Sequence, residues 1–550
     1  MSNDKVKFSS QLAENIWGHR FKDGQRGNEY TLEFLNVMAG TEYKLGAHYY
    51  SRKKMTNFRS FVFEGSKEGA KNKDGSHNFV EFSNVEKEKL IQTLGIDETD
   101  LGDLQQFFRN LKIQITTPTG KEADRSWYAS MLFPLHESLL FFELRTNKKT
   151  NSIAFERNFF ARGGELYYLM LTYGTKDNLQ LREEIELRLS DIMRQNKSVT
   201  DIVDRICENL DDYSIKENKN QNVAPLIKDK SLEGIISGWQ EKEYPSLPIE
   251  TESFTLFKDF AIELHALLHL DIDLYEMFSL LTSMISFQIH RYMIYRAEET
   301  NNVKNHYFFD CLDGQDIHIK RLAQDSYNAH ERSVRESFES FMNEHLQGLI
   351  PKGHEIELLK KWKVAAKKST EKKEIDRYEQ FLIDINFNSA HAPKKKSLIS
   401  AIEIIDENQA IKTLKNKIVN YSLDELTKKQ LPIIRTLARD GGFVAMGTGI
   451  RSRYILTDTF LSSLVYATLG SQEKMEFNEF MEQLFNKFDI VIGTEEAKKS
   501  GIYEKEGVNL KYFHNNEKKL RQKLKQNGLL QEYSDATALI QNPYYRVGGN

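Results

Sequence analysis

A basic helical segment near the C-terminus, within residues 512–543, constrains the fold of this chain more than any other stretch. Asn515 or Asn516 is expected to cap the helix, because an Asn side-chain oxygen can accept from the free amides of a first turn. Leu520 and Leu524 repeat at i, i+4 and give the helix one apolar stripe. The segment is therefore predicted to be an amphipathic helix that packs through this stripe.

The residues after this helix predict a β-hairpin. Asn527-Gly528 should end the helix, because both residue types tolerate the left-handed backbone of a helix stop. Residues 529–530 are apolar, residues 533–535 predict a turn, and residues 538–540 predict a returning strand. A basic helix followed by a hairpin is the layout of the recognition helix and wing of a winged helix-turn-helix.

Cationic side chains occupy much of the remaining helix surface. Lys and Arg neutralise phosphates and reach base edges. Arg521 is the candidate for a base or bidentate phosphate contact, because its guanidinium forks. Lys518, Lys519, Lys523 and Lys525 are assigned to phosphates. Two alternatives stay open: the charges only solvate an outer helix face, or the winged helix binds a protein.

A glycine-rich turn lies upstream of this segment, at Gly447-Thr448-Gly449, and Arg451 and Arg453 follow it. Glycines let backbone amides approach an anion, and neighbouring arginines would hold a phosphate. No GxxxxGK[ST] phosphate loop is present in the sequence. The favoured interpretation is a tight hairpin whose two arginines extend the DNA-facing surface.

Composition limits the classes of protein that this chain can belong to. Its 550 residues are enough for roughly three or four domains. The net charge of −4 means that any contact with nucleic acid must come from local patches. Two cysteines exclude a disulfide framework and fit a reducing cytoplasm. The apolar residues 277–295 include Gln288, His290 and Arg291, so they predict a buried core helix and not a membrane span.

The pattern of helices and strands predicts a mainly α (α+β) protein without internal repeats. The helices at 459–469, 477–488 and 514–527, followed by the hairpin, have the winged-helix order. The connection at 490–512 is longer than a minimal turn. The predicted parts are a mixed α/β domain (1–150), a helical core domain (151–300), a polar helical region (301–421) and a winged-helix-like domain (422–550).

A metal site at His265 and His269 is one alternative that the sequence leaves open. Their spacing of four suits two imidazoles that share a metal, with Asp271, Asp273 and His290 as further candidate ligands. The residue after His265 is alanine, so the general-base glutamate of HExxH is absent. Packed core histidines are the favoured interpretation, and we assign no metal.

Three other stretches contain residue types that could carry chemistry. Residues 305–318 contain Cys311 and two histidines, but nothing in the pattern orients a nucleophilic pair. Residues 155–171 combine aromatics with arginines, which suits stacking on single strands but favours a packed helix hairpin. Glu143 lacks the lysine of a nuclease ExK pair. We therefore assign no catalytic residue and no cofactor.

Two parts of the sequence resemble large uncharacterised proteins from prokaryotic anti-phage defence operons. The likeness rests on Trp-Gly-His-Arg-Phe at 17–21 with residues 29–37, and on residues 441–454 with 464–469. It transfers no catalytic residue. It implies a subunit that works beside an ATPase, nuclease or methyltransferase encoded nearby.

These observations together predict a cytoplasmic bacterial subunit of an anti-phage defence complex. Its role would be DNA binding or scaffolding, and its C-terminal winged helix would dock on double-stranded DNA. Two other classes stay open: a metal-dependent nuclease with dispersed carboxylates, and a protein–protein adaptor that does not bind DNA.

Overall fold

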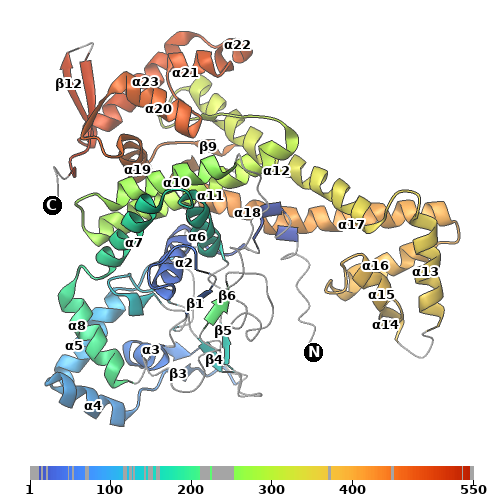
Figure 1. Ribbon diagram of the computed structural model, residues 1–550, viewed down its shortest axis with the longest axis horizontal. Helices are drawn as coiled ribbons and strands as arrows, with labels where there is room; N and C mark the ends of the chain where they lie inside the picture. The colour runs from blue at the N-terminus through green and yellow to red at the C-terminus, as the bar shows by residue number, and fades with distance from the viewer. Residues whose placement is uncertain are drawn as a thin grey trace.

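The computed structural model shows a mainly helical protein with short strands, as the composition and periodicity predicted (Figure 1). Among the described helices, none has both the length and the apolar character that crossing a bilayer requires. The structure describes residues 12–13, 16–19, 23–47, 49–51, 55–68, 74–115, 121–122, 127, 130–140, 144–146, 153–155, 162–210, 223–225, 253–368, 373–447, 451–534 and 537–545.

Helix α11 (Leu274–Asn301) is the centre of the main core. Asp273 caps it by accepting from the amide of Glu276, and residues 280–294 are all buried. A helix that is buried on every side lies inside a protein, so the predicted core helix at 277–295 is confirmed. The helices packed around it are α2 (Gly27–Gly40), α10 (Ser253–Leu268), α12 (Ile317–Leu349), α18 (Leu431–Asp440) and α19 (Asp458–Leu469).

Helices α2 and α6 (Gly163–Gly174) cross at very short range. A Cβ at Gly164 would lie 2.4 Å from the backbone nitrogen of Phe34, so only glycine fits there. The carboxylate of Glu33 on α2 accepts from the amides of Arg162 (3.1 Å) and Gly164 (2.9 Å). Glu33 thereby satisfies free amides at the start of α6 from another helix.

A second apolar core lies below the first and includes Phe58, Phe61, Leu90, Phe108 and Val203. Strand β2 (Lys67–Glu68) pairs antiparallel with β3 (Asn78–Phe79). The other elements in and near this part are α3 (Thr56–Val62), α4 (Asn84–Leu94), α5 (Glu98–Asn110), α7 (Leu179–Met193), α8 (Lys197–Asn209), the 3-10 turn Glu137–Leu139, and the strand pairs β1 (Tyr49–Ser51) with β6 (Val223–Pro225) and β4 (Leu144–Thr146) with β5 (Ile153–Phe155).

An arm extends from the body, formed by α12 and α17 (Glu407–Lys429) running together (Figure 1). Helix α12 has 33 residues and is therefore about 50 Å long. The expected boundary between residues 421 and 422 falls inside α17. Lys394–Lys396 are helical and follow Pro393, a residue type that fits the first turn of a helix. The outer end of the arm carries α13 (Glu355–Lys367), α14 (Glu374–Arg377), α15 (Glu379–Asp384) and α16 (Ala392–Ile402).

The C-terminal module follows a short hairpin of β8 (Val444–Ala445) and β9 (Arg453–Tyr454). Thr457 caps α19 by accepting from the amide of Phe460, and the predicted hairpin after the basic helix is present. The three-stranded antiparallel sheet has the order β10-β13-β12. The elements after α19 are β10 (Lys474–Glu476), α20 (Phe477–Phe488), β11 (Ile490–Val491), α21 (Thr494–Lys499), α22 (Ile502–Glu506), α23 (Leu510–Gln526), β12 (Leu530–Ser534) and β13 (Thr537–Gln541).

The connection between α20 and α23 joins the module to the body. In it, β11 pairs in parallel with β7 (Tyr307–Phe308). Next to this pair, Asn516 of α23 is fully buried and donates to the carbonyl oxygens of Phe309 (2.8 Å) and Ile492 (3.1 Å). Its own oxygen accepts from the amide of Cys311 (2.8 Å). The module therefore shares a hydrogen-bonded core with the body.

Candidate functional site

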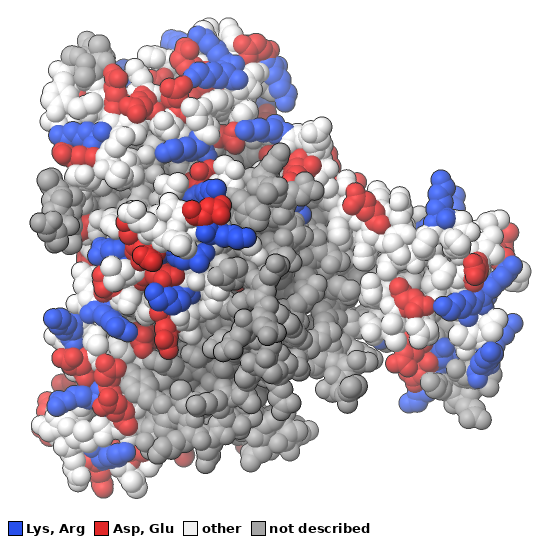
Figure 2. Space-filling model, viewed as in Figure 1, with Lys and Arg blue, Asp and Glu red and all other residues white. Residues whose placement is uncertain are grey.

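Helix α23 carries the strongest local charge of the module, with six Lys or Arg against one Glu in its sequence LKYFHNNEKKLRQKLKQ. Leu520 and Leu524 are buried, as the apolar stripe predicted. The predicted cap was wrong: Asn509 caps the helix by accepting from the amide of Lys511, because the helix begins before Asn515 and Asn516. Figure 2 shows basic and acidic side chains interspersed over this module at the top of the view.

Arg521 lies against a neighbouring helix. Its guanidinium carbon is 4.0 Å from the centre of the Phe477 ring on α20, and its Nε is 3.9 Å from a carboxylate oxygen of Glu517. A cation over an aromatic face is attracted by the ring quadrupole. The predicted role of Arg521 was a base or bidentate phosphate contact, and either contact would require the side chain to leave Phe477.

Two other predicted cations turn into the protein. The Nζ of Lys523 is 2.8 Å from Asp313 and donates to the carbonyl of Leu456, and its side chain is 12% exposed. The Nε of Arg453 is 2.9 Å from Asp310, whose side chain is fully buried. Burial raises the pKa of Asp310, while the Arg453 guanidinium acts to lower it. Both cations therefore connect the module to the segment 310–313 of the body.

The remaining predicted cations lie on the surface. Lys518 and Arg451 are exposed, and Lys519 is half-buried. Lys525 is 63% exposed and pairs with Glu532 on β12 at 2.9 Å. Exposed pairs of this kind contribute little to stability, so Lys525 easily exchanges Glu532 for another anion.

Lys511 is a further exposed cation, which the sequence analysis missed because it placed the start of the helix at residue 514. It lies about two helical turns before Lys518 and about four helical turns before Lys525, which are the other exposed lysines of α23. The signal that would have found it is the Asn509 cap, which is followed directly by the helical pattern.

A groove of about 360 Å³ lies between α23 and the turn at residues 312–316. Asp316 caps α12 by accepting from the amides of His318 and Ile319, so that helix start is already satisfied. The polar lining gives the groove hydrogen-bonding groups but only a modest positive charge. The lining residues are Leu312, Gln315, Asp316, Asn515, Lys518, Lys519 and Gln522.

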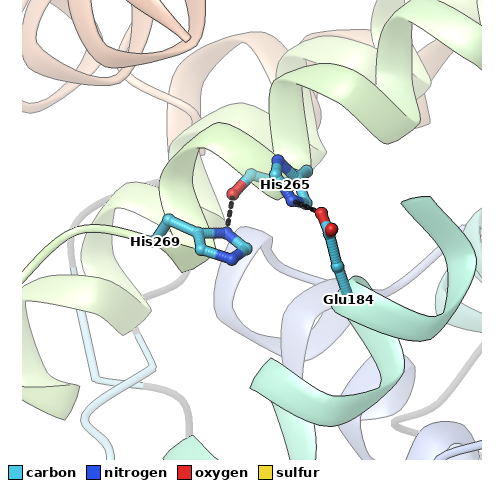
Figure 3. Close-up of side chains that lie close together, drawn as sticks. All are labelled: Glu184, His265 and His269. Atoms are coloured by element: carbon cyan, nitrogen blue, oxygen red, sulfur yellow. Dashed lines mark hydrogen bonds and ion pairs between the residues drawn. The ribbon is translucent and has the colours of Figure 1, made fainter. Parts of the chain in front are cut away.

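His265 and His269, the candidate metal ligands, lie close to Glu184, a residue that was not among the candidates from the sequence. Glu184 of α7 lies 2.6 Å from the Nε2 of His265, and His269 is next to it (Figure 3). The other candidate ligands serve elsewhere. Asp273 caps α11, and His290 is buried in that helix, with its Nδ1 3.3 Å from the hydroxyl of Tyr307.

The other chemical candidates are packed into the protein or lie outside the described residues. Cys311 is fully buried, and burial raises the pKa of its thiol, which keeps it protonated and unreactive. Tyr167 and Tyr168 are buried in α6, which agrees with a packed helix and not with a stacking surface. Glu143 lies outside the described residues.

Comparison with known proteins gives no family. No protein-family model matches the sequence, and no curated protein matches it. The interpretation of the site therefore rests on its own geometry.

Proposed function

We propose that the C-terminal module is a winged helix that docks this chain on duplex DNA. The observation that carries the proposal is the order α19, β10, α20, α23, β12 and β13, with β13 between β10 and β12 in the sheet. In a winged helix, the strand after the first helix pairs with the last strand of the wing in this way. The β11–α21–α22 segment is then an insertion before the recognition helix.

The contacts are to phosphates and not to base edges. The forked guanidinium of Arg521 is held on Phe477, and the cations left on the outer face of α23 are lysines. Lysine binds phosphate as a point charge, and phosphate contacts position a protein without reading sequence. Lys511, Lys518 and Lys519 are the central contacts, with Lys525 and Arg451 beside them.

The wider role follows from the resemblance to defence-operon proteins. The chain acts as a DNA-binding or scaffolding subunit of a cytoplasmic bacterial anti-phage complex. An ATPase, nuclease or methyltransferase partner supplies the chemistry. The helical body and its arm provide surface for such partners.

Binding of the full-length protein to a labelled duplex, measured by fluorescence anisotropy across a salt series, tests this proposal. Release of counterions by the three central contacts contributes about −3 to the slope of log K against log salt. The variant Lys511→Gln/Lys518→Gln/Lys519→Gln should weaken binding by at least about tenfold and make the slope less steep by about 3. Arg521 and Lys523 stay unchanged in this variant, because they hold the module together.

The matched control removes the same charge from the arm. Lys361, Lys367 and Lys368 are exposed on or at the end of α13, so their replacement by Gln should leave DNA affinity unchanged. Equal losses in the two triple variants would mean that only net charge matters. That result, or the absence of binding by the unaltered protein, would overturn the assignment.

A second candidate is a protein–protein adaptor whose winged helix binds a partner subunit. The interspersed acidic and basic side chains over the module favour it (Figure 2), because mixed charge suits a protein surface better than a polyanion. A stable complex with a neighbouring gene product, formed without any retention of DNA, would support the adaptor over DNA binding.

A further inference from the structure

Three side chains with metal-binding atoms converge where α7 and α10 meet (Figure 3). They are Glu184 from α7, His265 from α10 and His269 from the turn directly after α10, and their ligand atoms all lie within 4.8 Å of one another. The spacing of four residues, one helical turn, brings the two imidazoles to the same side at the end of α10. This is the one group of three or more such residues found among the described residues.

The hydrogen bond of His269 leaves one of its ring nitrogens free for a ligand. Its Nδ1 is 2.8 Å from the carbonyl oxygen of His265. A carbonyl oxygen only accepts, so Nδ1 carries the proton and donates. In the neutral ring, Nε2 then has an unshared lone pair. Metal-binding histidines commonly have their second nitrogen fixed by a backbone carbonyl in this way.

The two helices are held in place independently of any ion. The guanidinium of Arg188, one turn after Glu184 on α7, donates twice to the carbonyl of Leu268 on α10, at 3.1 and 2.9 Å. Glu184 and His265 lie on docked helices, which position ligands more rigidly than loops do, and His269 directly follows the end of α10. The site therefore needs only side-chain adjustments to receive an ion.

We propose that Glu184, His265 and His269 bind a divalent transition-metal ion, with Zn²⁺ as the best-matched occupant. Two imidazole nitrogens and one carboxylate oxygen suit zinc, whereas Mg²⁺ and Ca²⁺ prefer oxygen ligands throughout. Zinc holds such ligands at about 2.0–2.2 Å, which spaces tetrahedral donors roughly 3.3 Å apart. The 2.6 Å between His265 Nε2 and Glu184 Oε2 opens by less than 1 Å when the ion enters.

The ion joins α7 to α10 and leaves its fourth position to water. The residue after His265 is the buried Ala266, so α10 does not supply the glutamate base of the HExxH hydrolases. The neighbouring residues therefore favour a structural role, in which the bound ion links the two helices. This inference is independent of the proposed DNA binding, because α7 and α10 lie outside the C-terminal module.

Zinc binding by the untagged full-length protein, stripped with a chelator and then titrated against a chromophoric competitor, tests the site. We expect one equivalent of Zn²⁺ bound with an affinity on the order of micromolar or tighter, and a rise in melting temperature on binding. His269→Gln and Glu184→Gln each remove one ligand from an exposed or half-buried position, so both variants should fold. Each should weaken zinc binding by at least about tenfold.

His354 supplies a matched control, because its Nδ1 also lies near a carboxylate, 3.3 Å from Glu357, without a described third ligand. His354→Gln should bind zinc as the unaltered protein does. Cobalt(II) adds a second measurement: visible d–d absorption of a tetrahedral site should appear in the unaltered protein and be lost in His269→Gln. Zinc affinity that is equal in His269→Gln and the unaltered protein, or lowered equally by His354→Gln, would overturn the proposal.

Discussion

Asn516 offers the sharpest test of how the C-terminal module is held on the body. Asn516→Asp keeps the shape of the side chain and one acceptor but removes both N–H donors. The carbonyl oxygens of Phe309 and Ile492 then lose the amide that each accepts from, at a fully buried position. Each buried polar group left unsatisfied costs about 1–3 kcal/mol, so the expected loss is about 2–6 kcal/mol.

Hydrogen exchange measures this loss of stability at individual segments of the chain. A local measurement is needed because a chain of 550 residues does not unfold as one two-state unit. The amide of Cys311 donates to Asn516 itself and should report the opening of this junction. A destabilisation of 2 kcal/mol or more corresponds to exchange at least ~30-fold faster. Peptides that cover residues 307–311 and 490–493 should therefore lose protection together.

Asn515→Asp is the matched control, since it makes the same chemical change at the neighbouring, half-buried position. Asn515 has no described hydrogen bond, so a change within about 0.5 kcal/mol is expected. If both variants alter exchange of the junction peptides to the same extent, Asn516 does not hold the module to the body and the reasoning fails.

Three further substitutions test the body. Gly164→Ala should lower the melting temperature by several degrees because its Cβ would meet the backbone of α2 at 2.4 Å, and a loss no larger than that of an exposed-glycine variant would contradict this. Arg291→Leu leaves the buried carboxylate of Glu263, now 2.8 Å from the guanidinium, without its cation, so the melting temperature should fall by several degrees. Adding Glu263→Gln to this variant should restore much of the loss, and no recovery would contradict this cause. Burial raises the pKa of Glu298 to about 7 from an ordinary 4.5, so the folded state holds the proton and stability falls as pH rises between these values, by up to about 3 kcal/mol. Melting curves at pH 5 and pH 7.5 should show a smaller difference for Glu298→Gln, and an unchanged difference would refute the assignment.

Local patterns predicted the elements of the C-terminal module well. The helix at 477–488 has the predicted bounds, and the final hairpin is present. The start of α23 was misplaced because its segment offers three asparagines as caps. Asn509 is the cap, whereas Asn516 bonds to residues about 200 positions away, a partnership that no local pattern contains.

The same limit applies to the candidate sites. Sequence identified a basic helix but not which cations face outward, because Phe477 and Asp313 engage Arg521 and Lys523 from other elements. It also identified the spacing of His265 and His269 without their carboxylate partner. Helix α7 carries glutamates at 183, 184 and 186, and only the docking of α7 on α10 determines which of them meets the histidines.

The parallel pair of β7 and β11 has a consequence for synthesis of the chain on the ribosome. The two strands lie roughly 180 residues apart in sequence, and translation proceeds at about 5–20 residues per second. For about ten seconds or longer, the nascent polypeptide would carry Phe308 and the apolar start of α12 without the strand and helix that later cover them. During this interval, the emerging chain is expected to depend on a chaperone.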